Sequence, residues 1–204
     1  SVATGVTNDG QRFLAMAWLQ GEDLSQRLKR EGVDIHEAIA LARKVALGLA
    51  CAHAQGIVHR DIKPGNLFLV NGDPTEPRIL DFGVARLTDR DQRMTATGAA
   101  LGTPAYMSPE QAGGGQQPDA RADVFSLGTV LYECIAGQMA FGGDTLIDVL
   151  TKILFADTPR LAAVRPDVPP ALDAVVARMM AKDRSHRYAH GDEAAAALLA
   201  LEAL

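Results

Sequence analysis

The order of hydrophobic and polar residues changes character along the chain. Near its start, a turn at Asn8-Asp9-Gly10 separates residues 2–7 from an almost entirely apolar run at 12–19. Short apolar runs on either side of such a turn predict a β-hairpin. From about residue 24, apolar residues recur every three or four positions, which predicts helices instead. The pattern therefore predicts a small β start followed by a mainly α-helical body.

Helical periodicity first predicts a short helix at 24–30. A longer helix at 36–55 carries an apolar face made of Ile39, Ala42, Val45, Ala46 and Leu49. The segment 123–135 is almost wholly apolar, which is typical of a buried central helix. Three further amphipathic helices are predicted at 145–155, 170–181 and 192–204. Residues 67–70 predict a buried strand, and Asn71-Gly72-Asp73-Pro74 indicates a hairpin turn after it.

Composition limits the class of protein. A chain of 204 residues with 48% hydrophobic content can build one compact core. Its net charge of −5 argues against a nucleic-acid partner. No apolar run approaches the ~20 residues of a membrane span, so no membrane segment is expected in this chain. Cys51 and Cys134 lie in helical stretches and are expected to be buried, reduced thiols, not a disulfide or metal site. We therefore expect a cytoplasmic chain, whose parent protein could be membrane-anchored outside this segment.

The candidate chemistry lies between the 36–55 helix and the 67–70 strand. The loop reads His59-Arg60-Asp61-Ile62-Lys63-Pro64-Gly65-Asn66, and Asp81-Phe82-Gly83 follows a strand-like stretch. Asp61 can accept the proton of a hydroxyl, and Lys63 can reach a γ-phosphate. Asn66 and Asp81 offer the hard oxygen ligands that suit Mg²⁺. Each residue alone fits a solvated polar loop, but all of them at this spacing indicate phosphoryl transfer.

These two motifs resemble those of the protein kinase family, in particular the bacterial serine/threonine kinases of eukaryotic (Hanks) type. The resemblance implies a truncated α+β kinase fold, with a mainly α-helical large lobe and short β-hairpins. Residues 1–19 would be the last two strands of the small lobe and the hinge, and 20–204 the large lobe. The implied reaction transfers the ATP γ-phosphate to Ser or Thr hydroxyls of proteins, with ATP and Mg²⁺ (or Mn²⁺) as cofactors. Besides ATP and protein substrates, the implied partner is a second copy of the chain, in a homodimer that phosphorylates its own activation loops.

The resemblance assigns roles around the catalytic loop, the name used below for residues 59–66. Asp61 would be the catalytic base and Lys63 a phosphate contact. Asn66 and Asp81 would be metal ligands, and Thr103 would hydrogen-bond near Asp61 and Lys63. The implied nucleotide contacts are Met16, Ala17, Leu19, Asp23 and Phe68, although an ordinary strand exit also fits the segment 16–23. The implied structural residues are His59, Phe82, Gly83, Glu110, Asp123 and Arg187.

Two of these structural expectations concern buried charge. Glu110 and Arg187 are implied to form a buried ion pair, although they lie far apart in the sequence. Asp123 is implied to hold the backbone of the catalytic loop. The alternative for Asp123 is an N-terminal cap of the helix at 123–135, and both roles could hold at once.

Regulation is implied by the polar stretch 87–101, which corresponds to the activation loop of the family. Arg60, next to Asp61, could dock a phosphothreonine through charge-assisted hydrogen bonds. Thr95 and Thr97 are therefore candidate autophosphorylation sites. The alternative is that both are ordinary solvated threonines.

The sequence also departs from the family pattern. It contains no G-x-G-x-x-G motif, and nothing before residue 12 could supply the strand lysine and its glutamate partner. Because the chain begins at Ser1 in mid-pattern, we expect a fragment, although N-terminal processing is the simpler explanation. Weak nucleotide binding and low turnover are expected of these residues alone, with Val2, Phe13 and Ala15 left poorly covered. Two alternatives stay open: a non-catalytic kinase-like interaction module and a small-molecule phosphotransferase.

Overall fold

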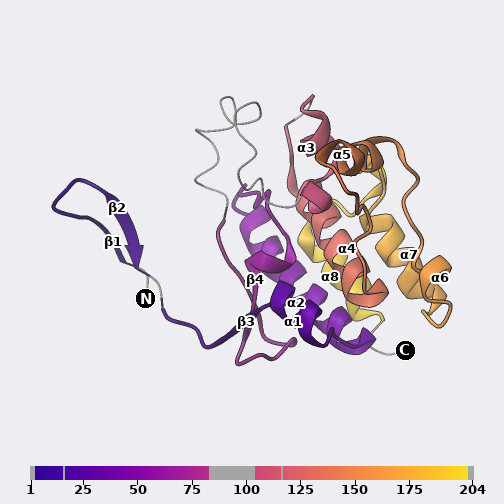
Figure 1. The fold of residues 1–204 in the computed structure, drawn as a ribbon, viewed down its shortest axis with the longest axis horizontal. Coiled ribbons are helices and arrows are strands. Elements are labelled where there is room, and N and C mark those ends of the chain that lie inside the picture. Colours follow the sequence, from indigo (N-terminus) through magenta and orange to yellow (C-terminus); the bar gives the residue numbers. More distant parts are fainter. Residues whose placement is uncertain (1–2, 16, 83–103, 116, 202–204) are drawn as a thin grey trace.

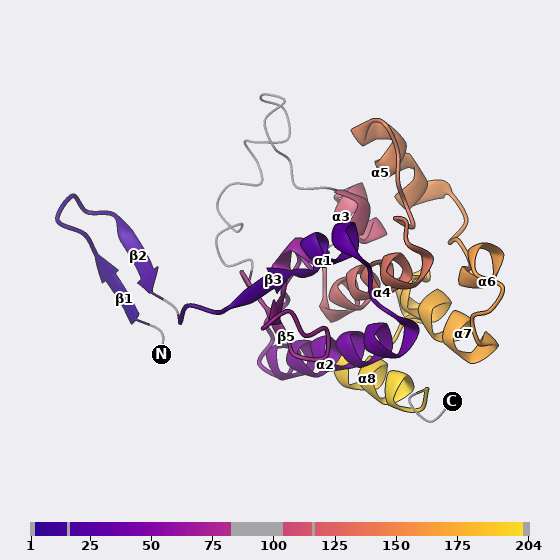
Figure 2. The same cartoon turned by 60° about the horizontal axis from the view of Figure 1, so that its bottom comes forward.

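A β-hairpin and a helical body make up the structure, a computed structural model that describes residues 3–15, 17–82, 104–115 and 117–201. In Figures 1 and 2 the hairpin extends away from the body, and a small second sheet lies against the helices. Both parts agree with the mainly helical fold and short hairpins expected from the sequence.

The hairpin joins β1 (Ala3–Val6) to β2 (Arg12–Ala15) in antiparallel register. β2 ends earlier than the predicted run at 12–19. Ala15 pairs with Ala3, the first residue of β1, so the backbone beyond Ala15 meets no further strand in the described part of the chain. Val6 is 63% exposed and Phe13 48%, because no other element of the described chain covers the faces of this two-stranded sheet.

The second sheet is antiparallel, with strand order β3-β4-β5. Its strands are β3 (Gly21–Asp23), β4 (Leu67–Val70) and β5 (Pro77–Ile79). The strand expected at 67–70 is buried on one face only: Leu67 and Leu69 are buried, whereas Phe68 and Val70 are half-buried. The predicted turn connects β4 to β5. Asp23 ends β3 and caps α1 (Leu24–Arg30) by accepting a hydrogen bond from the backbone N–H of Gln26, 3.0 Å away.

Two long helices form the centre of the body. α2 (Ile35–His53) begins with a capping box between Asp34 and Glu37. Its buried face contains all five apolar residues expected from the sequence. α4 (Ala120–Ala136) is buried along almost its whole length, as predicted for a central helix.

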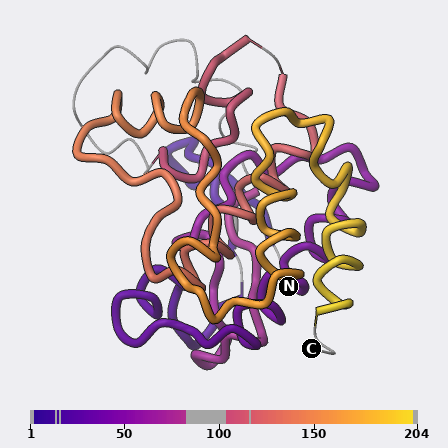
Figure 3. The backbone as a smooth tube through the Cα atoms, turned by 90° about the vertical axis from the view of Figure 1, so that its right-hand side faces the viewer, coloured from indigo at the N-terminus to yellow at the C-terminus, as the bar shows by residue number. Residues whose placement is uncertain are grey.

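The remaining helices pack around this centre. They are α3 (Pro109–Gly113), α5 (Leu146–Phe155), α6 (Leu161–Val164), α7 (Pro170–Met179) and α8 (Gly191–Leu199), with 3₁₀ turns at Pro64–Asn66, Pro104–Tyr106 and Arg184–His186. α3 and α6 were not predicted, because helices of one turn are too short to show a period. α8 lies along α2 (Figure 3). A Cβ on Gly191 would come within 2.3 Å of the Ala46 carbonyl oxygen, so glycine is required for this close approach.

Two findings concern the compositional expectations. Cys134 is buried, but the expectation that Cys51 is also buried is wrong: Cys51 is exposed. It follows the exposed Leu47 by one helical turn, so the period of α2 places it on the face opposite the core. Neither thiol is in a disulfide. Among the described helices, none combines the length and apolarity that crossing a membrane requires.

Candidate active site

Two side chains of the catalytic loop, those of Lys63 and Asn66, meet at the carboxylate of a third residue, Asp61. The Lys63 ammonium nitrogen lies 2.9 Å from Asp61 Oδ2. The Asn66 amide donates to the same oxygen at 3.0 Å and to the Asp61 backbone carbonyl at 2.7 Å. The Asp61 and Lys63 side chains are each 23% exposed. The loop therefore presents a carboxylate that is oriented by two donors and still reached by solvent.

The backbone of the catalytic loop is held on its buried side by Asp123. This fully buried carboxylate accepts hydrogen bonds from the backbone N–H groups of His59 and Arg60, both at 2.7 Å. His53, on α2, approaches it with Nε2 at 3.0 Å. Asp123 lies in the first turn of α4, but the N-cap of that helix is Asp119. The capping alternative for Asp123 is therefore wrong.

His59 connects the catalytic loop to the segment that precedes Asp81. Its buried ring accepts a hydrogen bond from the Asp61 backbone N–H at Nδ1, 3.3 Å away. Its Nε2 therefore carries the proton and donates to the Leu80 carbonyl at 2.9 Å. The ring of Phe82 meets the imidazole edge-on, with centroids 4.8 Å apart. His59 thus ties the catalytic loop to the segment that carries Asp81.

The oxygen ligands expected for a metal come from Asn66 and Asp81. The Leu80 backbone N–H donates to the backbone carbonyl of Asn66 at 2.9 Å, which keeps the two segments adjacent. Asp81 is exposed and has a φ of 51°, in the left-handed region. Within the described ranges no cluster of three or more His, Cys, Asp or Glu side chains could hold a metal ion. One amide and one carboxylate still fit Mg²⁺, because this ion commonly takes its other ligands from phosphates and water.

The residues expected to contact the nucleotide are only partly brought together. Phe68 is half-buried on β4, directly opposite Asp23 on β3. The Asp23 carboxylate already accepts hydrogen bonds from Ser25 and from the Gln26 backbone at the start of α1. Ala17 and Leu19 are exposed in the connection between β2 and β3. Met16, Gly83, Thr95, Thr97 and Thr103 lie outside the described residues.

The segment after the activation loop is tied to the central helix. Ser126 donates from its hydroxyl to the Tyr106 carbonyl at 2.7 Å, and the Tyr106 hydroxyl donates to Glu133 at 2.6 Å. Burial raises the pKa of Glu133, although the hydrogen bond from Tyr106 opposes this shift. Burial also raises the pKa of Tyr106. The sequence did not predict these contacts, the contact of His53 with Asp123, or a hydrogen bond from the Gln111 side chain to the Arg60 carbonyl. In each of them the two partners lie at least 20 residues apart in the sequence.

The expected ion pair between Glu110 and Arg187 lies in the core of the body. The guanidinium donates to both carboxylate oxygens, at 2.8 and 3.0 Å. The Arg187 side chain is 0% exposed and that of Glu110 6%. Arg187 also donates to three backbone carbonyls, those of Ala181, Arg121 and Lys182. The pair therefore joins α3 to the start of α4 and to the turn that follows α7.

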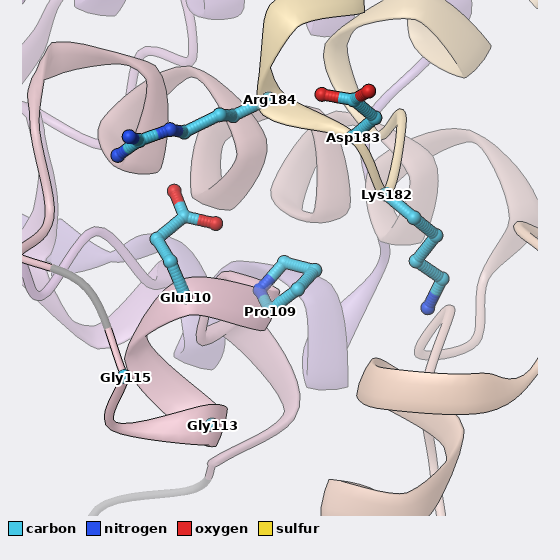
Figure 4. A pocket seen from close by; sticks show the side chains of 7 residues that line it. All are labelled: Pro109, Glu110, Gly113, Gly115, Lys182, Asp183 and Arg184. Atoms are coloured by element: carbon cyan, nitrogen blue, oxygen red, sulfur yellow. The ribbon is translucent and has the colours of Figure 1, made fainter.

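A hollow of about 450 Å³ lies beside this ion pair (Figure 4). The residues that line it are Pro109, Glu110, Gly113, Gly115, Lys182, Asp183 and Arg184. Lys182 points away from Glu110 and donates to two carbonyls at the end of α5, while burial lowers its pKa to about 8. Arg184 pairs with Asp119 at 3.6 Å, and Asp183 accepts from Ser185. Because its charged groups already have protein partners and none belongs to the catalytic loop, this hollow is not the candidate nucleotide site.

Known proteins are similar to this sequence over almost its whole length. The family model described as protein kinase domain matches residues 2–199. Serine/threonine-protein kinase PknH of Mycobacterium tuberculosis is 40% identical over 195 residues, which cover 95% of this chain and 30% of that protein. PknL of the same species is 40% identical over 183 residues, 89% of this chain and 45% of that protein. Serine/threonine-protein kinase pkn3 of Myxococcus xanthus is 34% identical over 206 residues, 97% of this chain and 38% of that protein. The chain thus spans less than half the length of these relatives.

Removing Glu110 tests the energetic weight of the buried pair. Glu110→Ala leaves the Arg187 charge unpaired in the core, so we expect the free energy of unfolding to fall by roughly 3–5 kcal/mol. Urea denaturation measures this change. Asp167→Ala, which removes an exposed pair with Arg165, is the control and should leave the midpoint unchanged. Equal midpoints for the Glu110 variant and the wild type would show that the pair does not stabilise the body.

Proposed function

We propose that the protein carrying this chain, which belongs to the protein kinase domain family, transfers the γ-phosphate of ATP to serine or threonine hydroxyls of proteins. The observation that carries the proposal is the convergence of Lys63 and Asn66 on the Asp61 carboxylate. A non-catalytic interaction module would not need this arrangement. Lys63 at its position, together with the names of the relatives, supports serine and threonine as acceptors.

The chemistry proposed for the site rests on positions and charges. The substrate hydroxyl gives its proton to Asp61 as its oxygen bonds to the γ-phosphorus, and the bond to the ADP oxygen breaks. Lys63 neutralises charge on the transferred phosphoryl group. Asn66 and Asp81 would hold Mg²⁺ or Mn²⁺, and such an ion supplies charge neutralisation at the β- and γ-phosphates. Thr103 would hydrogen-bond near Asp61 and Lys63 and help present the acceptor hydroxyl.

The proposed nucleotide site is formed by the connection between β2 and β3, by the end of β3 and by β4. Met16, Ala17 and Leu19 would lie along the adenine edge, Phe68 would form its floor, and Asp23 would contact the ribose. The pairing of Asp23 with Phe68 across β3 and β4 supports this arrangement. Within it, residues 1–19 belong to the small lobe and hinge and residues 20–204 to the large lobe. The detached, exposed hairpin supports this division, because it needs further sheet to cover its apolar side chains.

Regulation through the activation loop is the second part of the proposal. The Arg60 side chain has a buried Nε atom with no hydrogen-bond partner among the described residues. Buried guanidinium groups are normally satisfied, and a phosphate is a strong bidentate acceptor for them. Phosphorylation of Thr95 or Thr97 would supply such an acceptor next to the catalytic base. A homodimer in which one copy phosphorylates the loop of the other is the arrangement we propose for this step.

Replacing the base tests the catalytic part. In the full-length protein, Asp61→Asn keeps the shape of the side chain and removes its ability to accept the proton. We expect transfer of labelled phosphate from ATP to casein to fall by roughly 10²–10⁴-fold, and chelation of divalent metal to abolish the wild-type rate. Asp73→Asn, in the exposed turn between β4 and β5, is the control and should keep wild-type activity. Equal rates for the Asp61 variant and the wild type would contradict the proposed function.

Mapping phosphorylated peptides tests the regulatory part. Active full-length protein incubated with ATP should carry phosphate on Thr95, Thr97 or both. The double substitution to alanine should reduce casein phosphorylation by about 10-fold or more, because Arg60 then lacks its acceptor. Thr75→Ala, in an exposed turn, is the matched control. Active enzyme with neither activation-loop threonine modified would rule this mode of regulation out.

A further inference from the structure

The Gln111 carboxamide connects two segments that the proposed reaction must align. Gln111 lies on α3, in the segment that follows the activation loop. Its Oε1 accepts hydrogen bonds from the backbone N–H and the hydroxyl of Ser108, at 3.1 and 3.2 Å. Its Nε2 donates to the backbone carbonyl of Arg60 at 2.8 Å. One side chain thus bridges the start of α3 and the catalytic loop, 51 residues earlier in the sequence.

The carbonyl that Gln111 holds belongs to the peptide unit leading into the catalytic base. Arg60 O and Asp61 N are parts of the same rigid plane, so fixing one atom fixes the direction in which Asp61 leaves it. Arg60 has a φ of 66°, in the left-handed region that residues other than glycine rarely adopt. Such a conformation persists only where neighbouring groups hold it. Here Asp123 holds the Arg60 N–H at 2.7 Å and Gln111 holds its carbonyl.

We infer that Gln111 is a positioning residue for Asp61, and that it couples the order of the segment 104–111 to the geometry of the catalytic loop. The inference rests on the proposed function, since it assigns a role relative to the proposed base. The chemistry explains why an amide is suited to this place. One end must accept from the Ser108 N–H and the other must donate to a carbonyl, and a carboxylate or an apolar side chain cannot do both.

A purely local role would use only half of this side chain. Accepting the Ser108 N–H is the reciprocal half of a capping box, which stabilises the start of α3. The donation to Arg60 contributes nothing to that cap, because the carbonyl belongs to another segment. A substitution that keeps the acceptor and removes the donor therefore separates positioning from capping.

Gln111→Glu makes this change with almost no change in shape. We would compare it in the full-length protein with Gln55→Glu, which also removes an amide-to-carbonyl hydrogen bond, the one to Cys51 at 3.2 Å on α2. The readouts are kcat and KM for ATP and for casein, together with amide hydrogen exchange of residues 59–62. Gln111→Met, which is uncharged, undergoes the same measurements in case the carboxylate prevents folding.

For Gln111→Glu the inference predicts a kcat lowered by about 10-fold or more and a KM for ATP within about twofold of wild type, because a small misplacement of the base slows the chemical step. Exchange at residues 59–62 should become several-fold faster, and Gln55→Glu should change neither quantity. A raised KM for casein with unchanged kcat would overturn the inference, because Gln111 would then act on the docking segment alone. Unchanged exchange at 59–62 would also overturn it. Exchange can be measured without phosphotransfer, so an inactive wild type would refute the proposed function and still leave the positioning role tested.

Discussion

The core and the site both depend on the hydrogen bonds that the buried carboxylate of Asp123 accepts. A buried charge costs several kcal/mol unless hydrogen bonds replace the lost water. Asp123 is fully buried, and His59, Arg60 and His53 supply three close contacts to it. Its place in the first turn of α4 adds the favourable field of the helix N-terminus. The catalytic loop therefore keeps its shape because that shape satisfies a charge in the core.

His53 extends this dependence to the end of the chain. Its Nδ1 accepts the Gly191 backbone N–H at 3.3 Å, so the proton lies on Nε2 and points at Asp123. Gly191 is the first residue of α8, and its missing side chain lets that helix lie close along α2. One hydrogen-bonded path thus runs from α8 through α2 and α4 to the catalytic loop. The helices far from the catalytic loop therefore help to fix the backbone that carries the proposed base, Asp61.

Periodicity and a dense local motif account for the features that could be predicted from the residues alone. Within the buried face of α2, and within the group formed by Asp61, Lys63 and Asn66, the residues lie only a few positions apart. Their spacing alone therefore brings the members of each group together. Glu110 with Arg187, and Asp123 with the catalytic loop, join residues 63–77 positions apart. Only the resemblance to a family indicated these contacts.

Other features could not be read from the pattern, for physical reasons. The exposure of Cys51 is an exception: the predicted apolar face of α2 already places this residue opposite the core, and only the apolar composition of its stretch suggested burial. Residues 17–19 are as apolar as the run before them and yet form no strand, because apolar character alone does not supply the neighbouring strand that β-structure requires. The contact of Gln111 with Arg60 depends on tertiary structure, although the Ser108–Gln111 spacing does signal a helix start.

The most direct test of the central claim is the hydrogen exchange of the His59 and Arg60 amides in this chain, with and without the Asp123 carboxylate. The structure predicts that both amides exchange at least roughly 100-fold more slowly than exposed loop amides. Asp123→Ala should abolish this protection, whereas Asp119→Ala, which removes the cap of the same helix and its ion pair with Arg184 but no contact to the loop, should preserve it. Fast exchange of both amides in the wild type, or protection that survives Asp123→Ala, would contradict the claim that this carboxylate holds the catalytic loop.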